Sequence, residues 1–142
     1  MINAGFASFV LLVVCALVHY EMLSLLKVSL GRMAIIPRRA KLFFVILGAM
    51  FSHLLQIALF ASAYFLLRDK VGLGSFGGAF VDTFSSFLYF STETYTSLGF
   101  GDIYPTGAIR MLAGLEALTG LVMISWTASF TYLEMTQYWT DS

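Results

Sequence analysis

The residues of this chain with the most distinctive spacing lie between Glu93 and Pro105, in the sequence ETYTSLGFGDIYP. Hydroxyl side chains come first, two glycines follow one residue apart, and Asp102 comes directly after them. Glycine adopts left-handed dihedrals without steric cost, so alternating glycines allow consecutive backbone carbonyls to point the same way. A ring of such carbonyls can replace the hydration shell of a cation. Residues 97–101, SLGFG, therefore predict an ion-binding backbone, to which the Ser97 hydroxyl adds a further oxygen.

The segments that must hold this stretch have the length of membrane spans. Of the 142 residues, 59% are hydrophobic and 11% are charged, whereas a soluble domain carries about a quarter charged residues. Three apolar segments, residues 4–26, 42–67 and 111–133, each exceed the ~20 residues that a helix needs to cross a bilayer. The composition therefore predicts an integral membrane protein that contacts the lipid bilayer. The formal net charge of zero gives no reason to expect a nucleic-acid partner.

The sequence between the second and third segments is too short and too polar for another span. Residues 68–78 contain four glycines, which is typical of a loop. Residues 82–96 predict a short helix with Asp82 or Thr83 as its N-cap. Non-helical backbone at membrane depth is tolerated only where protein buries it or where it lines a water-filled path. We therefore predict an all-α membrane protein with three transmembrane helices and a re-entrant short helix that leads into the loop at 97–101.

Charge sets the expected orientation of these segments. Five of the eight Lys and Arg residues lie in or beside the connection between the first two segments, and none precedes the first segment. The positive-inside rule puts that connection in the cytoplasm, the N-terminus outside and the C-terminus inside. We expect an extra N-terminal transmembrane helix at residues 1–30, a cytoplasmic basic linker at 31–41 and a short cytoplasmic tail at 134–142. The first helix lacks a ladder of arginines, so voltage sensing by it is not expected.

Residues 42–132 resemble the two-helix-plus-pore-loop module of potassium channels, most closely the prokaryotic proton-gated type. The contiguous residues 93–105 are similar to that family's pore-helix glutamate, threonine-rich turn, filter, aspartate and following Tyr-Pro. The resemblance implies a homotetramer around a central pore, because one chain supplies one filter strand, and a bacterial inner membrane. It implies a pore domain at 42–133, made of an outer helix at 42–67, a pore helix at 82–96, a selectivity filter at 97–101 and an inner helix at 107–133.

The same resemblance implies roles for individual residues. Glu93 and Asp102 meet behind the filter in the resembled channels and share a proton. Thr96 and the pore-helix aromatics Tyr89 and Phe90 complete the support of the filter. No cofactor is expected apart from potassium ions bound in the filter, where the coordinating groups are the backbone carbonyls of Ser97, Leu98, Gly99 and Phe100.

Four positions depart from the family's usual pattern. Ser97 stands where threonine is usual, and Leu98 where valine is usual. Phe100 replaces a tyrosine, and Phe90 replaces the tryptophan that bonds to it, so donor and acceptor are lost together. The resemblance implies a potassium-selective channel, and these departures leave a weakly selective monovalent cation channel as the alternative.

Two other classes of membrane protein stay open. A potassium transporter subunit also uses pore loops, although such subunits usually carry four degenerate loops with a single filter glycine each. A non-conducting membrane interaction subunit would keep the fold without passing ions. The sequence shows no nucleophile–base pair and no metal-binding spacing, so an enzyme is not expected.

The third apolar segment resembles the inner helix of the same channels. Gly120 falls at the family's hinge glycine, where it would allow a bend for gating. Close helix packing is the competing interpretation, since small residues line helix interfaces in membranes, and Gly114 suits that interpretation better. Four residues below the glycine recur at helical spacing and are candidates for the cavity and inner gate: Leu121, Ser125, Ala128 and Tyr132.

Ionisable side chains within apolar segments are candidates for function. Glu116 is expected to find a donor or to keep its proton, because an unpaired charge at that depth is costly. Counting ~1.5 Å per residue from the cytoplasmic side puts His53 and Glu116 at heights that differ by ~8 Å, within the reach of two long side chains on tilted helices, so His53 is one candidate partner for Glu116 in a polar coupling. A hydroxyl or amide on another helix is the competing partner for Glu116. His53 and Gln56 share a helix face, and the sequence assigns no role to His19 and Glu21.

Overall fold

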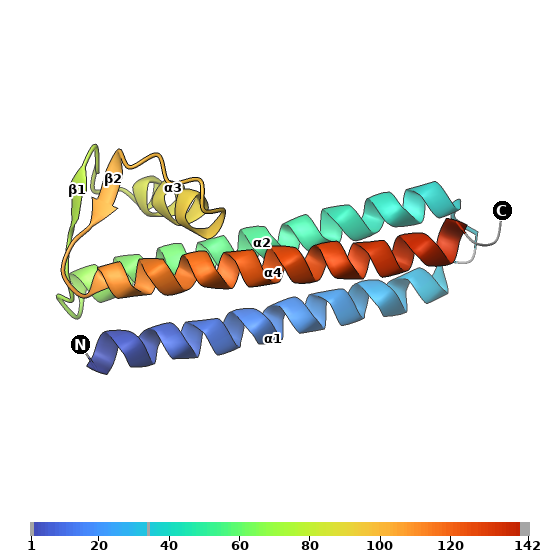
Figure 1. Ribbon diagram of the computed structural model, residues 1–142, viewed down its shortest axis with the longest axis horizontal. Coiled ribbons are helices and arrows are strands. Elements are labelled where there is room, and N and C mark those ends of the chain that lie inside the picture. Colours follow the sequence, from blue (N-terminus) through green and yellow to red (C-terminus); the bar gives the residue numbers. More distant parts are fainter. Residues whose placement is uncertain (1, 34, 140–142) are drawn as a thin grey trace.

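A computed structural model of the chain describes residues 2–33 and 35–139. Within these residues the chain forms four helices and two short strands (Figure 1). In chain order they are α1 (Ile2–Arg32), α2 (Arg38–Asp69), β1 (Phe76–Gly78), α3 (Phe84–Tyr95), β2 (Ile103–Pro105) and α4 (Ile109–Trp139).

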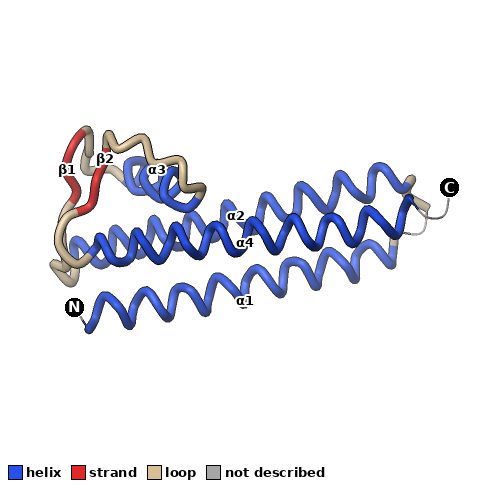
Figure 2. The backbone as a smooth tube through the Cα atoms, in the orientation of Figure 1, coloured by secondary structure: helices blue, strands red, loops and turns tan. Residues whose placement is uncertain are grey.

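Three of the helices, α1, α2 and α4, lie side by side along the length of the molecule (Figures 1 and 2). Each is long and apolar enough to cross a membrane, with candidate spans at Gly5–Arg32, Arg39–Asp69 and Ile109–Gln137. At ~1.5 Å per residue they exceed the ~30 Å of hydrocarbon in a bilayer. The prediction of three membrane-length helices is confirmed, and the chain is an integral membrane protein.

The helices extend further than the apolar pattern indicates. α2 begins at Arg38 instead of residue 42, directly after Pro37, whose φ of −58° suits a helix start. α4 continues to Trp139, so residues 134–139 of the expected tail are helical, and residues 140–142 lie outside the described part of the chain. The apolar pattern marks only the part of a helix that lies in hydrocarbon, whereas the backbone hydrogen bonds continue into the polar interface.

The short helix α3 lies against one end of α2 and α4, beside the strand pair (Figure 1). β1 and β2 are antiparallel, with Gly77 opposite Tyr104. The expectation of an all-α fold with a loop at 68–78 missed these strands. Each has three residues, which is too short to show an alternating pattern, and the partners are far apart in sequence.

Aromatic packing holds α3 against α2. The ring of Phe76 lies 5.0 Å from Phe90 and 5.5 Å from Phe87, and the ring of Tyr64 lies 5.2 Å from Phe90. Edge-to-face pairs at these distances are favourable beyond the apolar area that they bury. The pore-helix candidate α3 is therefore fixed to α2 and to β1 by aromatic packing.

An ion pair joins the end of α2 to the residues that precede α3. Arg68 Nη2 lies 2.7 Å from Asp82 Oδ2, and the guanidinium carbon lies 5.2 Å from the ring of Phe87. Asp82 is therefore the partner of the last turn of α2, and Thr83 is the N-cap residue of α3. Of the two N-cap candidates that the sequence offers, the structure selects Thr83.

Candidate functional site

The backbone of residues 97–101 alternates between two dihedral regions. φ is 58° at Ser97, 57° at Gly99 and 79° at Gly101, and all three values are left-handed. Leu98 and Phe100 lie between them with negative φ. Such alternation allows successive carbonyls to face one side of the backbone, as an ordinary strand of L-residues cannot. The pattern that the glycines predict is present, and it includes Ser97.

Glycine is required at positions 99 and 101 because of their backbone dihedral angles, and not because a side chain would lack space. A Cβ built on Gly99 or Gly101 meets no atom within 4 Å among the described residues. A left-handed conformation costs an L-residue about 1–2 kcal/mol, and Ser97 adopts it with its amide donating to Thr94 O at 3.0 Å. No signal in the sequence marks Ser97 as left-handed, because its side chain is compatible with either region.

Glu93 holds three successive amides of this segment. Its backbone carbonyl accepts hydrogen bonds from the amides of Leu98 at 2.8 Å and Gly99 at 3.2 Å. Its carboxylate Oε2 accepts the amide of Phe100 at 3.1 Å. Glu93 is buried, with 3% of its surface exposed. One residue near the end of α3 therefore fixes the backbone of residues 98–100.

The Glu93 carboxyl lies in surroundings that favour its proton. Burial raises the pKa of Glu93 above its usual range, the hydrogen bond from the Phe100 amide opposes that shift, and the nearby Asp102 carboxylate adds to it. Asp102 has its own partners: Tyr89 donates its hydroxyl to Asp102 Oδ2 at 3.1 Å, and the Ala79 amide donates to Asp102 O at 2.8 Å. A proton shared between Glu93 and Asp102 stays a prediction, since the Glu93 carboxyl is hydrogen-bonded to the Phe100 amide and the Asp102 carboxyl to the Tyr89 hydroxyl.

The other predicted supports lie around this segment in different ways. Thr96, the C-cap residue of α3, donates its hydroxyl to Thr92 O at 2.7 Å. Phe90 packs against Tyr64 and Phe76 of its own chain. The side chains of the filter itself are open: Leu98 is 59% exposed and Phe100 is 67% exposed. Large apolar side chains in such positions are free to contact another molecule.

A comparison with models of known families matches residues 42–137 to an ion channel family. The chain belongs to this ion channel family. An inward rectifier potassium channel, Kirbac3.1 of Paramagnetospirillum magnetotacticum, is 34% identical over 86 residues, which is 60% of this chain. The chain spans 28% of the length of that relative. No solved structure gives a match. The resemblance to a channel pore module is confirmed, and the whole of α1 lies outside the region matched to the family.

The inner-helix glycines of the channel differ from the expectation. A Cβ on Gly120 would lie 1.9 Å from the backbone oxygen of Tyr95, so α4 packs tightly against the end of α3 at this point. Gly114, which the sequence favours for close packing, has no atom within 4 Å of a built Cβ in the described part of the chain. The expectation for Gly114 is wrong within one chain, and a hinge at Gly120 stays a prediction beside its packing role.

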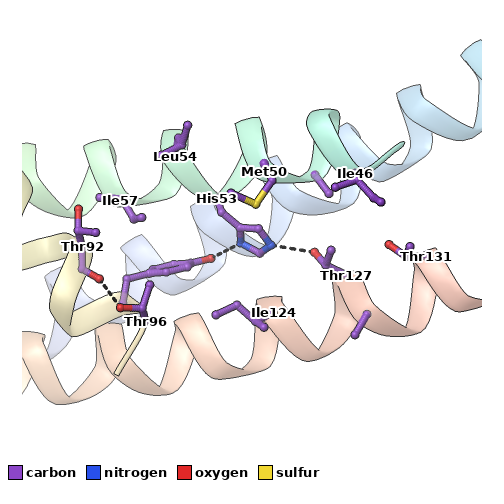
Figure 3. A pocket seen from close by; sticks show the side chains of 13 residues that line it. Ile46, Met50, His53, Leu54, Ile57, Thr92, Thr96, Ile124, Thr127 and Thr131 are labelled. Carbon is purple, nitrogen blue, oxygen red and sulfur yellow. Dashed lines mark hydrogen bonds between the residues drawn. The ribbon is translucent and has the colours of Figure 1, made fainter. Parts of the chain in front are cut away.

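The residues predicted to line the cavity share an open face of α4. All four are exposed in the single chain, and their role in the channel stays a prediction: Leu121, Ser125, Ala128 and Tyr132. Ala128 also lines a pocket of about 510 Å³ between α2, α3 and α4 (Figure 3).

The predicted coupling of His53 to Glu116 is wrong. Glu116 is fully buried, and Tyr64 and Ser91 donate their hydroxyls to its two carboxyl oxygens, each at 2.5 Å. His53 lies instead between the Tyr95 hydroxyl and Thr127 Oγ1, with both distances at 2.9 Å (Figure 3). The competing interpretation, a hydroxyl on another helix as the partner of Glu116, holds.

The wrong pairing of His53 with Glu116 arises from helix ends that lie further out than the apolar pattern indicates. Counted from the observed ends, Glu116 is 23 residues from Trp139 and His53 is 15 residues from Arg38. At ~1.5 Å per residue the two heights differ by ~12 Å. The sequence also gives little sign that Ser91, Tyr64 and Thr127 take part in these contacts. Their only signal is a hydroxyl within an apolar segment, which does not say which helix it faces.

Proposed function

We propose that this chain forms a homotetrameric cation channel, most selective for potassium, in which ions pass along the backbone carbonyls of residues 97–101. The observation that carries the proposal is the left-handed φ at Ser97, Gly99 and Gly101, held by Glu93 at the end of a short helix. Membership of an ion channel family supports it. The relative named an inward rectifier potassium channel supports potassium as the ion.

Four copies around one axis follow from the chemistry of the site. One chain supplies one strand of carbonyls, which can coordinate an ion from one side only. Replacing the whole hydration shell needs a ring of such strands. The exposed side chains of Leu98 and Phe100 supply apolar surface for neighbouring copies. In this arrangement α3 and residues 97–101 form a re-entrant loop that enters from the outside, with the basic α1–α2 connection in the cytoplasm.

The mechanism is passive. An ion exchanges its water for the carbonyl oxygens and moves on when a following ion repels it. The C-terminal end of α3 carries the negative end of the helix dipole, which favours a cation in the cavity below. Phe100 lacks a hydroxyl with which to anchor the filter to neighbouring aromatics, so Glu93 and Tyr89 must provide that support.

Purified protein in liposomes tests this function. With a potassium gradient we expect rapid flux, and with potassium inside and sodium outside we expect a reversal potential near that for potassium. A reversal potential near zero would assign a weakly selective monovalent cation channel. Slow saturable uptake would assign a transporter subunit, and no flux in a correctly assembled tetramer would assign a non-conducting interaction protein.

A further inference from the structure

The first helix, α1, contributes a buried polar side chain to the channel domain although the whole of this helix lies outside the family match. His19 is fully buried between α2 and α4. Its Nδ1 lies 3.1 Å from Gln56 Nε2 and 3.2 Å from Ser52 Oγ, and its Nε2 lies 3.2 Å from Thr127 Oγ1. Its ring also lies 5.3 Å from Trp126 and 5.2 Å from His53, centroid to centroid.

These contacts continue into a closed circle of side chains. Thr127 Oγ1 lies 2.9 Å from His53 Nε2, and His53 Nδ1 lies 2.9 Å from the Tyr95 hydroxyl (Figure 3). Tyr95 donates its hydroxyl to Gln56 Oε1 at 3.0 Å. We call these five residues the polar ring: His19, Thr127, His53, Tyr95 and Gln56. It takes one side chain each from α1, α3 and α4 and two from α2.

The protons of the polar ring can all run in one direction. Gln56 Nε2 is a hydrogen-bond donor only, so His19 Nδ1 must be the acceptor. His19 Nε2 then carries the proton and donates it in a hydrogen bond to Thr127 Oγ1. The Thr127 hydroxyl then donates to His53 Nε2, and His53 Nδ1 donates to Tyr95. The Tyr95 hydroxyl donates to Gln56 Oε1, which closes the circle. With both histidines neutral, each group in the circle is satisfied, and bonds in such a chain polarise and strengthen one another.

The polar ring ends at the residue that fixes the start of the filter. Tyr95 is the last residue of α3, two residues before the left-handed Ser97. Its backbone oxygen is pressed against Gly120, and its side chain is fully buried. The pocket of about 510 Å³ lies beside it, between α2, α3 and α4. Apolar packing is incomplete on that side, so the hydrogen bonds of the Tyr95 hydroxyl fix the position of its aromatic ring.

We propose that α1 is a built-in support of the filter and that His19 is its positioning residue, acting through Gln56 and Thr127 on Tyr95. Without His19, Thr127 loses a donor and Gln56 Nε2 keeps only Ser52 as an acceptor, so the circle opens. Tyr95 keeps its partners His53 and Gln56, but these two side chains are then held less firmly, and so is the turn from Thr96 to Ser97. The effect on selectivity rests on the proposed function, whereas the effect on the order of the filter backbone does not.

Four variants separate this role from ordinary packing. His19→Ala opens the polar ring at α1, and Tyr95→Phe opens it at α3 while removing only one oxygen. His19→Gln keeps a donor and an acceptor on a side chain of similar reach. Leu23→Ala is the matched control, because Leu23 is buried on the same helix at 4% exposure and is not a member of the polar ring.

Amide hydrogen exchange of residues 93–101 is the first measurement. In His19→Ala and Tyr95→Phe we expect about tenfold faster exchange of the amides of Leu98, Gly99 and Phe100, the effect of losing one buried hydrogen bond. We expect partial rescue in His19→Gln and no change in Leu23→Ala. The ratio of potassium to sodium permeability, from reversal potentials, should fall in the same order. Adding His19→Ala to Tyr95→Phe should change neither quantity further.

The outcomes separate the two proposals. Unchanged exchange in both His19→Ala and Tyr95→Phe, or equal acceleration in Leu23→Ala, would overturn the role of His19 while leaving the channel intact. If His19→Ala fails to assemble, the comparison of Tyr95→Phe and His19→Gln with Leu23→Ala decides. If the wild-type protein passes no potassium, the proposed function falls, and the exchange comparison still decides whether α1 supports this segment.

Discussion

Two hydrogen-bond systems meet at the end of α3, and they are built in opposite ways. On the filter side, Glu93 collects three main-chain amides within seven residues of itself. On the other side, the polar ring joins five side chains from residue 19 to residue 127, and none of its bonds uses the backbone. The filter side is local and exposed in the single chain, and the polar ring is long-range and mostly buried.

The difference suggests that the two systems do different work. Main-chain donors fix the dihedral angles of a carbonyl array, and glycine makes those angles accessible. Side-chain donors on four helices fix where the array sits relative to the rest of the molecule. A change in the first system should alter the ion path itself, and a change in the second should alter how firmly the path is held.

The largest expected effect comes from the filter glycines. Gly99→Ala or Gly101→Ala should abolish selective potassium conduction, because φ values of 57° and 79° cost alanine about 1–2 kcal/mol in each of four chains. A built Cβ meets nothing within 4 Å in the described chain, so subunits should still fold and assemble. Reversal potentials and native-state mass measurement check both parts.

Gly114→Ala is the matched control for these variants. It also meets nothing within 4 Å of a built Cβ in the described chain, but it lies within α4, where alanine is favoured over glycine by about 1 kcal/mol. We expect unchanged selectivity and equal or higher stability. Unchanged potassium selectivity in both filter variants would refute the assignment of residues 97–101 as the ion path.

The sequence predicts the local system well and the long-range one poorly, for a physical reason. A filter shows itself in contiguous residues, since glycines at positions 99 and 101 and the carboxyl of Glu93 act on their own neighbours. The polar ring depends on how each helix is rotated about its axis, and a helix that is apolar on all sides carries no pattern that fixes this rotation. The same ambiguity, with helix ends misplaced by several residues, led to the wrong pairing of His53 with Glu116.

The next effect in size concerns Glu116, which attaches α3 from the buried side. Ser91 Oγ contacts both Glu116 Oε1 and Ile57 O, one more acceptor than its single proton can serve. A proton on Glu116 would satisfy both contacts. Glu116→Gln, which can donate to Ser91 and accept from Tyr64, should therefore change the free energy of unfolding by less than about 1 kcal/mol.

Glu116→Ala should be much more damaging. It leaves the buried hydroxyls of Tyr64 and Ser91 without this partner and creates a cavity, which together cost about 3–5 kcal/mol. Denaturant unfolding in detergent measures both variants. Equal losses in Glu116→Gln and Glu116→Ala would show that Glu116 is ionised and that its charge, not its shape, holds the two hydroxyls.

A substitution at Gly120 tests the point where the two hydrogen-bond systems meet. Tyr95 contributes its backbone carbonyl to the contact with Gly120 and its side chain to the polar ring. In Gly120→Ala the new Cβ would lie 1.9 Å from Tyr95 O, so the backbone must move, at a cost of about 1–3 kcal/mol. We expect lower stability and faster exchange of the filter amides. Higher stability with slower opening would instead favour a hinge, because alanine stiffens a helix without needing space.

The smallest expected effect separates the charge of Glu93 from its shape. Glu93→Gln keeps an acceptor for the Phe100 amide, so stability near pH 4.5 should change by no more than about 1 kcal/mol.

Because burial raises the pKa of Glu93 in the folded protein, the folded state holds this proton more tightly than the unfolded state does. The stability from that difference is present below the unfolded pKa of 4.5 and is lost as pH rises through the folded pKa. Wild-type thermal stability should therefore fall with rising pH relative to that of Glu93→Gln. Tyr89→Phe, which removes only the bond to Asp102, should keep the wild-type slope. Parallel slopes for wild type and Glu93→Gln would mean that Glu93 is ionised throughout, and that Phe100 is held by a charged acceptor.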